Sequence, residues 1–423
     1  MTLLASILIA GLAVLNWSYA KSILFPPVVF CLVWASILMG LVLSGNTFYP
    51  LSAITPIVCV LGCVAFSAGA MAFHPLRGLG KFRRWQARTL REDKWTLRAI
   101  DVLFVIFAGL YPVYWMRLAE MGHGSVGLAL LQQVRLEMIE GDLGNSAGLG
   151  PFRYVLAALI VITLIVTTET CRMHLSKWRL FLWILLAMAY NIPTGSRLSS
   201  LVVLFGVLAI FAFAKNSIPL LPAISIGMAV VIVFAVVAIA MGKGGSLTQS
   251  PLENASGVVR SLQVYVFGGI VACDQSLQKP PERPQEMPSF RFFDEVAVAL
   301  GSHTSAPPLL LPYVNTPSET NAYSVFYSYF GDFGWAGMSA IFMGLGMGFA
   351  GLYRAAAMGR PEAVTLLGLG CAYLVLTCSG DPFLSGLSAC IQSATLVWLI
   401  YDIVPLLRWC NVAFSPSQKL SKG

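Results

Sequence analysis

Charged residues are scarce in this chain of 423 residues, since Asp, Glu, Lys and Arg make up only 11% of it while 57% of the residues are hydrophobic. Such a composition is typical of integral membrane proteins. Apolar runs of about 20 residues, the length that a helix needs to cross a bilayer, recur along the whole sequence. The segments of alternating polarity that build membrane β-barrels are missing. The composition therefore predicts an all-α protein that crosses the membrane many times.

Several motifs of soluble enzymes are absent as well. No cluster of His, Cys, Asp or Glu has the spacing of a metal site, and no glycine-rich phosphate loop ends in Lys-Ser or Lys-Thr. We therefore expect no cofactor and no bound metal. The nine cysteines fall mainly in apolar runs, which indicates packing rather than disulfides. The net charge of +8 lies in short loops between these runs, so it indicates membrane orientation and not nucleic-acid binding.

Pro, Gly and charged residues divide the apolar runs into eleven expected spans, which form a single integral membrane domain over residues 1–423. The first run has no basic segment before it and no cleavage site after it, so we expect a retained span. The expected spans are residues 2–20, 23–44, 53–73, 99–117, 152–171, 178–194, 199–214, 219–241, 333–353, 363–379 and 385–406.

Two hydrophilic connections set the expected orientation. Residues 74–98 are basic, and the longer segment 242–332 joins spans eight and nine. If residues 74–98 are cytoplasmic, eighteen Lys and Arg residues fall on that side and nine on the other. The positive-inside rule then predicts an external N-terminus and a cytoplasmic C-terminus. The amphipathic loop 118–150 and the large loop 242–332 are both expected outside.

Arginine predominates among the basic residues expected outside, with seven arginines against two lysines. A guanidinium group binds planar, multiply anionic groups with paired hydrogen bonds, so this preference predicts such a ligand. The arginines expected to bind it are Arg135, Arg153, Arg197, Arg260 and Arg291.

Two of these arginines lie in informative surroundings. Arg135 is the centre of an apolar stripe in residues 128–141, which predicts a surface helix that directs one guanidinium inward or, alternatively, a snorkelling arginine. Arg197 opens a span directly after a Pro–Gly break, which indicates an anion site at a helix N-terminus or, alternatively, an interfacial hairpin. The stripe around Arg135 consists of Leu128, Leu131, Met138 and Ile139.

Two acids precede the ninth span. Asp332 lies between Gly331 and Gly334, which we expect to allow close helix packing, and it is expected to cap this helix, to hold an arginine or to act as a base. Glu319 is the other candidate base, because no partner for it is visible in the sequence.

Three stretches together resemble a known family. The turn TGSR, the arginine-bearing helix before the fifth span and the block NAYSVFYSYFGDFGWAG at 321–337 are similar to the Wzy-type oligosaccharide repeat-unit polymerases of bacterial surface polysaccharide synthesis. The resemblance implies a metal-independent membrane glycosyltransferase of the GT-C type at the periplasmic face of the inner membrane. Its donor and acceptor would be repeat units on undecaprenyl pyrophosphate, for O-antigen or a similar polysaccharide, and a chain-length regulator protein is a possible partner.

This resemblance also implies roles for the site residues. The arginines would stabilise the charge of the leaving pyrophosphate, and Glu319 or Asp332 would take the proton of the acceptor hydroxyl. Asn321 and Tyr323 would contact the substrate. Aromatic side chains of this block are expected to stack on sugars or to form a membrane-interface belt: Tyr323, Phe326, Tyr327, Tyr329 and Trp335.

Two other functions stay open at the level of sequence. An O-antigen ligase uses the same lipid donor, and it would place arginines and a histidine such as His303 in a large external loop. A lipid-linked oligosaccharide flippase or other transporter would line a path through the membrane with charged residues, and the expected spans contain few of them.

Overall fold

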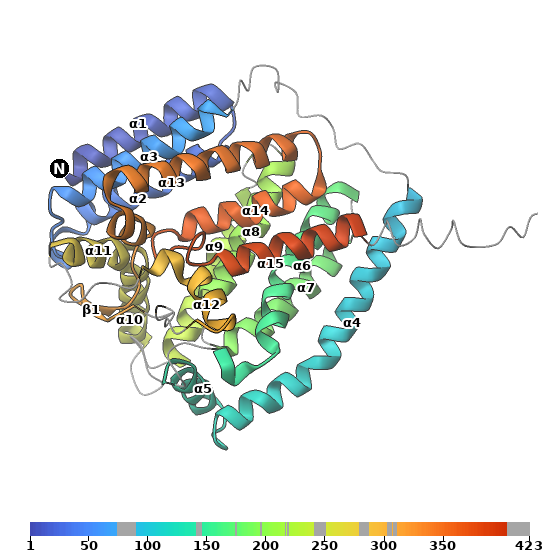
Figure 1. The fold of residues 1–423 in the computed structure, drawn as a ribbon. Coiled ribbons are helices and arrows are strands. Elements are labelled where there is room, and N and C mark those ends of the chain that lie inside the picture. The colour runs from blue at the N-terminus through green and yellow to red at the C-terminus, as the bar shows by residue number, and fades with distance from the viewer. Residues whose placement is uncertain are drawn as a thin grey trace, which may run out of the picture.

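The computed structural model is a bundle of helices (Figure 1). In the part of the chain that it describes, eight helices are long and apolar enough to cross a membrane. The protein is therefore a multi-pass helical membrane protein, as the composition predicts. The described residues are 1–73, 90–140, 146–173, 176–194, 197–215, 217, 220–240, 251–278, 287–302, 307 and 311–403.

Each of the eleven expected spans coincides with a helix. Seven of them are among the eight helices that meet the length and hydropathy needed for crossing, and the eighth is Ser256–Gln278, which the sequence predicts as part of a loop. The helices at the expected spans are α1 (Thr2–Ala20), α2 (Pro26–Leu43), α3 (Ile54–Ala72), α4 (Leu90–Met121), α6 (Phe152–Met173), α7 (Lys177–Asn191), α8 (Arg197–Lys215), α9 (Leu220–Ala240), α13 (Val325–Ala357), α14 (Pro361–Leu376) and α15 (Leu387–Trp398), which continues as the π-helix η6 (Leu399–Ile403).

Small residues let α3 and α13 lie in direct backbone contact. A Cβ atom on Gly69 would lie 1.9 Å from the carbonyl oxygen of Met343, and one on Gly346 would lie 2.0 Å from that of Phe66. Close packing of this kind holds helices together in lipid, where burial of apolar side chains gives no advantage over lipid contact. Buried aromatic rings complete this core: Phe30, Trp34, Phe66, Phe326 and Phe342.

A second core forms where α14 and α6 pack against α8. Gly206 and Gly368 lie at these contacts, and a Cβ atom on Gly368 would be 2.4 Å from Cγ1 of Ile210. Helices α4 and α7 cover this core from outside, with the ring of Trp183 packed against Phe104 and Phe107.

Helix ends meet on two opposite sides of the bundle. On one side, Tyr353 near the end of α13 contacts the rings of Phe25 and Phe213, at ring distances of 5.4 and 5.9 Å. On the other side, the Val325 amide at the start of α13 donates to the Thr377 carbonyl after α14, at 2.9 Å. We call this second side, which carries the starts of α3, α8 and α13 and lies at the left of Figure 1, the Asp332 side.

The segment 242–332 is largely helical where it is described. Its elements are α10 (Pro251–Gln263), the π-helix η4 (Val264–Gly268), α11 (Gly269–Gln278), the short helix η5 (Pro288–Phe290), α12 (Arg291–Ala299) and a small antiparallel hairpin of β1 (Val314–Asn315) and β2 (Glu319–Thr320). Most of the proline-rich stretch 279–289 lies outside the described residues.

The apolar segment Ser256–Gln278 lies along the Asp332 side rather than through the bundle. Arg197 at the start of α8 donates to Ser261, the Ser324 amide before α13 donates to the Gly269 carbonyl, and Ser52 before α3 donates to Asp274. All three partners lie at helix ends on this one side. The three contacts join this segment to the helix ends on the Asp332 side, and its helical structure was not expected.

The loop 118–150 contains the expected helix, α5 (Leu128–Glu140), followed by the short helix η2 (Ser146–Leu149). The buried positions described on α5 are Leu130 and Val134, which the expected apolar stripe does not include. Leu130 packs against Gly122 at the end of α4, and α5 also contacts η3 (Ile192–Thr194), the turn before α8.

Candidate functional site

Arg197 is the first residue of α8, as the sequence predicts. Its side chain is buried, with 7% of its surface exposed, and its Nη1 donates to Oγ of Ser261 on α10 at 2.7 Å. A buried guanidinium at a helix N-terminus adds its charge to the positive end of the helix dipole. Ser196, which precedes Arg197 in the turn TGSR, lies outside the described residues.

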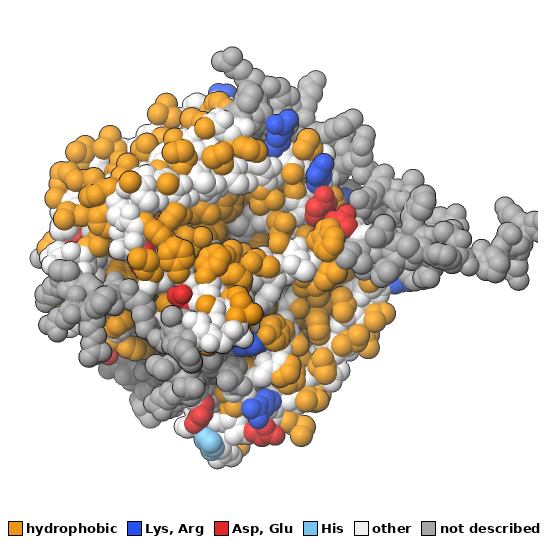
Figure 2. Space-filling view, viewed as in Figure 1, with side chains coloured by type: hydrophobic (Ala, Val, Ile, Leu, Met, Phe, Trp, Pro, Cys, Tyr) orange, Lys and Arg blue, Asp and Glu red, His pale blue; other side chains and the backbone are white. Residues whose placement is uncertain are grey.

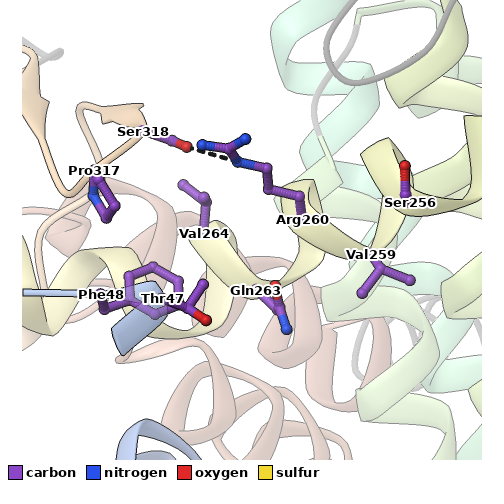
Figure 3. Close-up of a pocket in the computed structure, with 9 residues that line it drawn as sticks. All are labelled: Thr47, Phe48, Ser256, Val259, Arg260, Gln263, Val264, Pro317 and Ser318. Atoms are coloured by element: carbon purple, nitrogen blue, oxygen red, sulfur yellow. Dashed lines mark hydrogen bonds between the residues drawn. The ribbon is translucent and has the colours of Figure 1, made fainter. Parts of the chain in front are cut away.

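Arg260 precedes Ser261 on α10 and faces a cavity on the Asp332 side (Figure 3). Its Nε donates to Oγ of Ser318 at 3.1 Å, and its two Nη groups have no hydrogen-bond partner in the described part of the chain. The cavity has a volume of about 610 Å³, within the usual range for ligand sites. It is lined by Thr47, Phe48, Ser256, Val259, Arg260, Gln263, Val264, Pro317 and Ser318.

The hairpin of β1 and β2 presents Ser318 to Arg260. The turn is fixed because Thr316 donates through both its amide and its Oγ1 to the Ser318 carbonyl, at 2.9 Å each. Glu319 follows Ser318 directly, lies opposite Asn315 in the β-hairpin and has an exposed side chain. The candidate base thus lies beside the residue that contacts Arg260, although it does not line the cavity itself.

The side chains of Asn321 and Tyr323 differ in their exposure to solvent. Asn321 is partly buried after the hairpin, whereas Tyr323 is 4% exposed and donates its hydroxyl to the Pro312 carbonyl at 3.0 Å. Burial raises the pKa of the Tyr323 phenol, so this group stays a proton donor. Tyr323 therefore supports the hairpin more directly than it faces a substrate.

The aromatic block 323–335 is mostly core. Phe326 and Tyr329 are fully buried, and Tyr327 is buried against Tyr323 with ring centroids 4.4 Å apart. Among the five aromatic residues that we expected to stack on sugars or to form a belt, Trp335 alone is exposed. The physical reason is that α13 starts eight residues earlier than the expected span, so these rings join the helix packing.

Asp332 does not cap α13, contrary to one expectation. Its Oδ2 accepts a hydrogen bond from the Ser289 amide at 3.0 Å, so it holds the short helix η5. The helix axis breaks two residues later at Gly334, whose φ of 64° favours glycine. Gly331 was expected to allow close packing, yet a Cβ atom there would meet nothing within 4 Å.

Arg291 lies near Asp332 in the fold but pairs with another acid. Its Nε donates to Oε1 of Glu295 at 2.8 Å on α12, and its buried Nη1 has no hydrogen-bond partner among the described residues. Ser289, the partner of Asp332, stands two residues before Arg291. Arg291 and Asp332 thus belong to one corner at the start of α12, separate from the Arg260 cavity.

The remaining two arginines are less well placed. Arg153 is exposed at the start of α6, where its guanidinium lies 4.7 Å from the ring of Tyr154 and donates to that hydroxyl. The side chain of Arg135 lies outside what the structure describes, although α5 packs against η3 just before Arg197. His303 also lies outside the described residues.

One acid that sequence reasoning missed organises this side. Asp274 on α11 is 2% exposed and accepts hydrogen bonds from the Ser52 amide and hydroxyl, the Thr55 hydroxyl and the Gln278 amide group. A buried carboxylate is stable only with such partners. The available signal was an acid at the end of an apolar run, GGIVACD at 268–274.

Known proteins give no guide to this site, because no protein-family model, curated protein or solved structure matches the chain. In the described residues, no group of three or more His, Cys, Asp or Glu side chains is arranged to hold a metal ion.

Proposed function

We propose that the protein is a membrane glycosyltransferase that polymerises undecaprenyl-pyrophosphate-linked oligosaccharide repeat units for O-antigen or a similar surface polysaccharide. The observation that carries the proposal is that Arg197 and Arg260 are both attached to neighbouring positions of α10, Arg197 through its contact with Ser261. Arg197 contacts Ser261, and Arg260 stands next to Ser261 at a cavity of ligand size. A lipid pyrophosphate carries several negative charges on its phosphate oxygens. Guanidinium groups such as those of Arg197 and Arg260 can bind these oxygens through paired hydrogen bonds.

The proposed reaction needs only these groups and one base. The acceptor hydroxyl attacks the anomeric carbon of the donor sugar, and the bond from this carbon to the pyrophosphate oxygen breaks. Undecaprenyl pyrophosphate leaves with the bonding electrons, and Arg197 and Arg260 stabilise the charge that grows on it. Glu319, exposed beside Ser318, takes the proton of the acceptor hydroxyl.

We place eleven spans in the bacterial inner membrane, with the N-terminus and the Asp332 side in the periplasm. Helix-end contacts support this path, because Tyr353 meets Phe25 and Phe213 on one side while Val325 meets Thr377 on the other. The charge distribution supports it as well, because the side opposite to Asp332 carries most described basic residues of the helix ends. These are Lys21, Arg98, Arg172, Lys177, Arg179, Lys215, Arg354 and Arg360.

A transporter is a weaker alternative. Where the structure describes the eleven proposed spans, their buried acids and arginines are Glu169 and Arg172, which pair with each other at 3.0 Å, and Arg197. Glu169 and Arg172 lie near the end of α6 rather than along a path through the bundle. A charged transport path would need such residues at several depths.

The lipopolysaccharide of a strain without this protein tests the proposal. We expect lipid A core that carries a single repeat unit, and a full ladder after the gene is restored. Core without any repeat unit would instead indicate a ligase or a flippase. Cysteine labelling tests the orientation separately: residues in 242–332 should react from outside intact cells, and residues in 74–98 only after permeabilisation.

A further inference from the structure

The short helix α12 is amphipathic, because its charged residues share one face, which also carries Val298, and most of its large apolar residues lie on the other. Arg291, Asp294 and Glu295 lie on the charged face, where Arg291 pairs with Glu295. Four large apolar residues lie between the end of η5 and the residue after α12. Their helical spacing puts them on one face. They are Phe290, Phe293, Val296 and Leu300.

This apolar face is exposed. Phe293 is 52% exposed and Leu300 84%, and Phe290 and Val296 are also exposed. The ring of Phe290 lies 5.4 Å from that of Phe333 on α13, so the face adjoins the kink of α13. Figure 2 shows hydrophobic side chains gathered on the face of the molecule that carries α12.

The position of α12 indicates what covers this face. The hydrogen bond from the Ser289 amide to Asp332 holds the start of α12 against α13. Asp332 lies two residues before the kink at Gly334, and beyond Gly334 helix α13 continues as a span. Trp335, the first residue after the kink, is 45% exposed and extends the apolar surface onto that span. Tryptophan is enriched where spans leave the lipid, so Trp335 indicates that the kink of α13, and with it α12, lies at that level.

We propose that α12 is an interfacial helix whose apolar face is inserted into the membrane leaflet on the Asp332 side. Its partner is the lipid between the headgroups and the upper acyl chains, as for other amphipathic helices that lie in the plane of a membrane. Insertion leaves the exposed side chain of Glu295, on the opposite face, directed away from the lipid. This contact with the membrane surface is independent of the reaction that the protein catalyses.

Photocross-linking of the full-length protein tests the insertion. Phe293 is replaced by p-benzoylphenylalanine, and the purified protein is reconstituted in vesicles of phosphatidylcholine and phosphatidylglycerol that contain radiolabelled phosphatidylcholine. The matched control carries the same photoreactive residue at Glu295, which is exposed on the other face of α12. A positive control carries it at Val105, which is 70% exposed on the span of α4.

After illumination, we expect the Phe293 variant to bind several-fold more lipid per protein than the Glu295 variant, and about as much as the Val105 variant. A variant with the photoreactive residue at Leu300 should agree, which guards against a folding defect at Phe293. Equal labelling at Phe293 and Glu295, with strong labelling at Val105, would overturn the proposal. So would a covalent dimer of the chain formed from Phe293, because the face would then be a protein contact.

Discussion

Replacement of Arg197 by lysine separates a phosphate-binding arginine from an interface anchor. The substitution keeps the charge but removes the planar group with its five N–H donors. Arg197 donates through Nη1 to Ser261 at 2.7 Å and is 7% exposed, so its position is fixed by the surrounding protein. A lysine ammonium is a single point charge, and it cannot contact Ser261 and also form paired hydrogen bonds with a phosphate.

The size of the effect follows from the lost contact. A hydrogen bond to a charged group contributes about 1.5–3 kcal/mol. If one such contact to the leaving pyrophosphate is lost in the transition state, chain extension should slow by about 10- to 150-fold, since about 1.4 kcal/mol corresponds to a factor of ten. An arginine that only anchors the helix at the interface would lose far less, because lysine serves as well at an exposed interface.

The assay is the initial rate of chain extension by purified protein in vesicles that contain lipid-linked repeat units, together with the lipopolysaccharide ladder in cells. Arg354→Lys is the matched control, because Arg354 is exposed in the last turn of α13 on the opposite side. We expect normal chain extension in this control. Full activity of Arg197→Lys at normal protein levels would refute the phosphate-binding role.

Three further substitutions test the acids. Glu319→Gln should abolish chain extension and leave thermal stability unchanged, since the amide cannot take a proton; an unchanged ladder would exclude Glu319 as the base. Asp332→Asn should keep part of the activity, because the asparagine oxygen can still accept from the Ser289 amide, whereas an inactive but stable protein would make Asp332 the base. Asp274→Asn should lower the free energy of unfolding by about 2–3 kcal/mol, because one carboxylate oxygen becomes a donor facing other donors; an unchanged unfolding midpoint would contradict this.

The helices were predictable because hydrophobicity alone requires them. In lipid every backbone amide needs a partner within its own segment, so an apolar run of sufficient length becomes a helix. The same argument could not place Ser256–Gln278, whose mean hydropathy of 1.4 equals that of the span at Val325–Ala357. Its position depends on the hydrogen bonds to Arg197, Ser52 and Ser324, which come from distant parts of the chain.

Among the site residues, position along a helix was predictable and partners were not. Arg197 was correctly placed at the start of α8, because Pro and Gly break the preceding helix. The partner of Asp332 is 43 residues away in sequence, so no local pattern indicates it. Hydropathy also cannot separate aromatic rings in a membrane belt from rings in a core, and this is why Tyr329 and Phe326 were not recognised as buried.

Helix α10 links the two arginines that the proposed reaction needs. Arg260 and Ser261 are neighbours, so their side chains point about 100° apart around the helix. One therefore reaches Ser318 on the hairpin while the other accepts from Arg197 on α8. Farther along the same segment, Asp274 fixes α11 to the start of α3. The spacing between the hairpin and α8 is thus set by one helical segment anchored at its far end, and a displacement of α10 would alter both arginine contacts together.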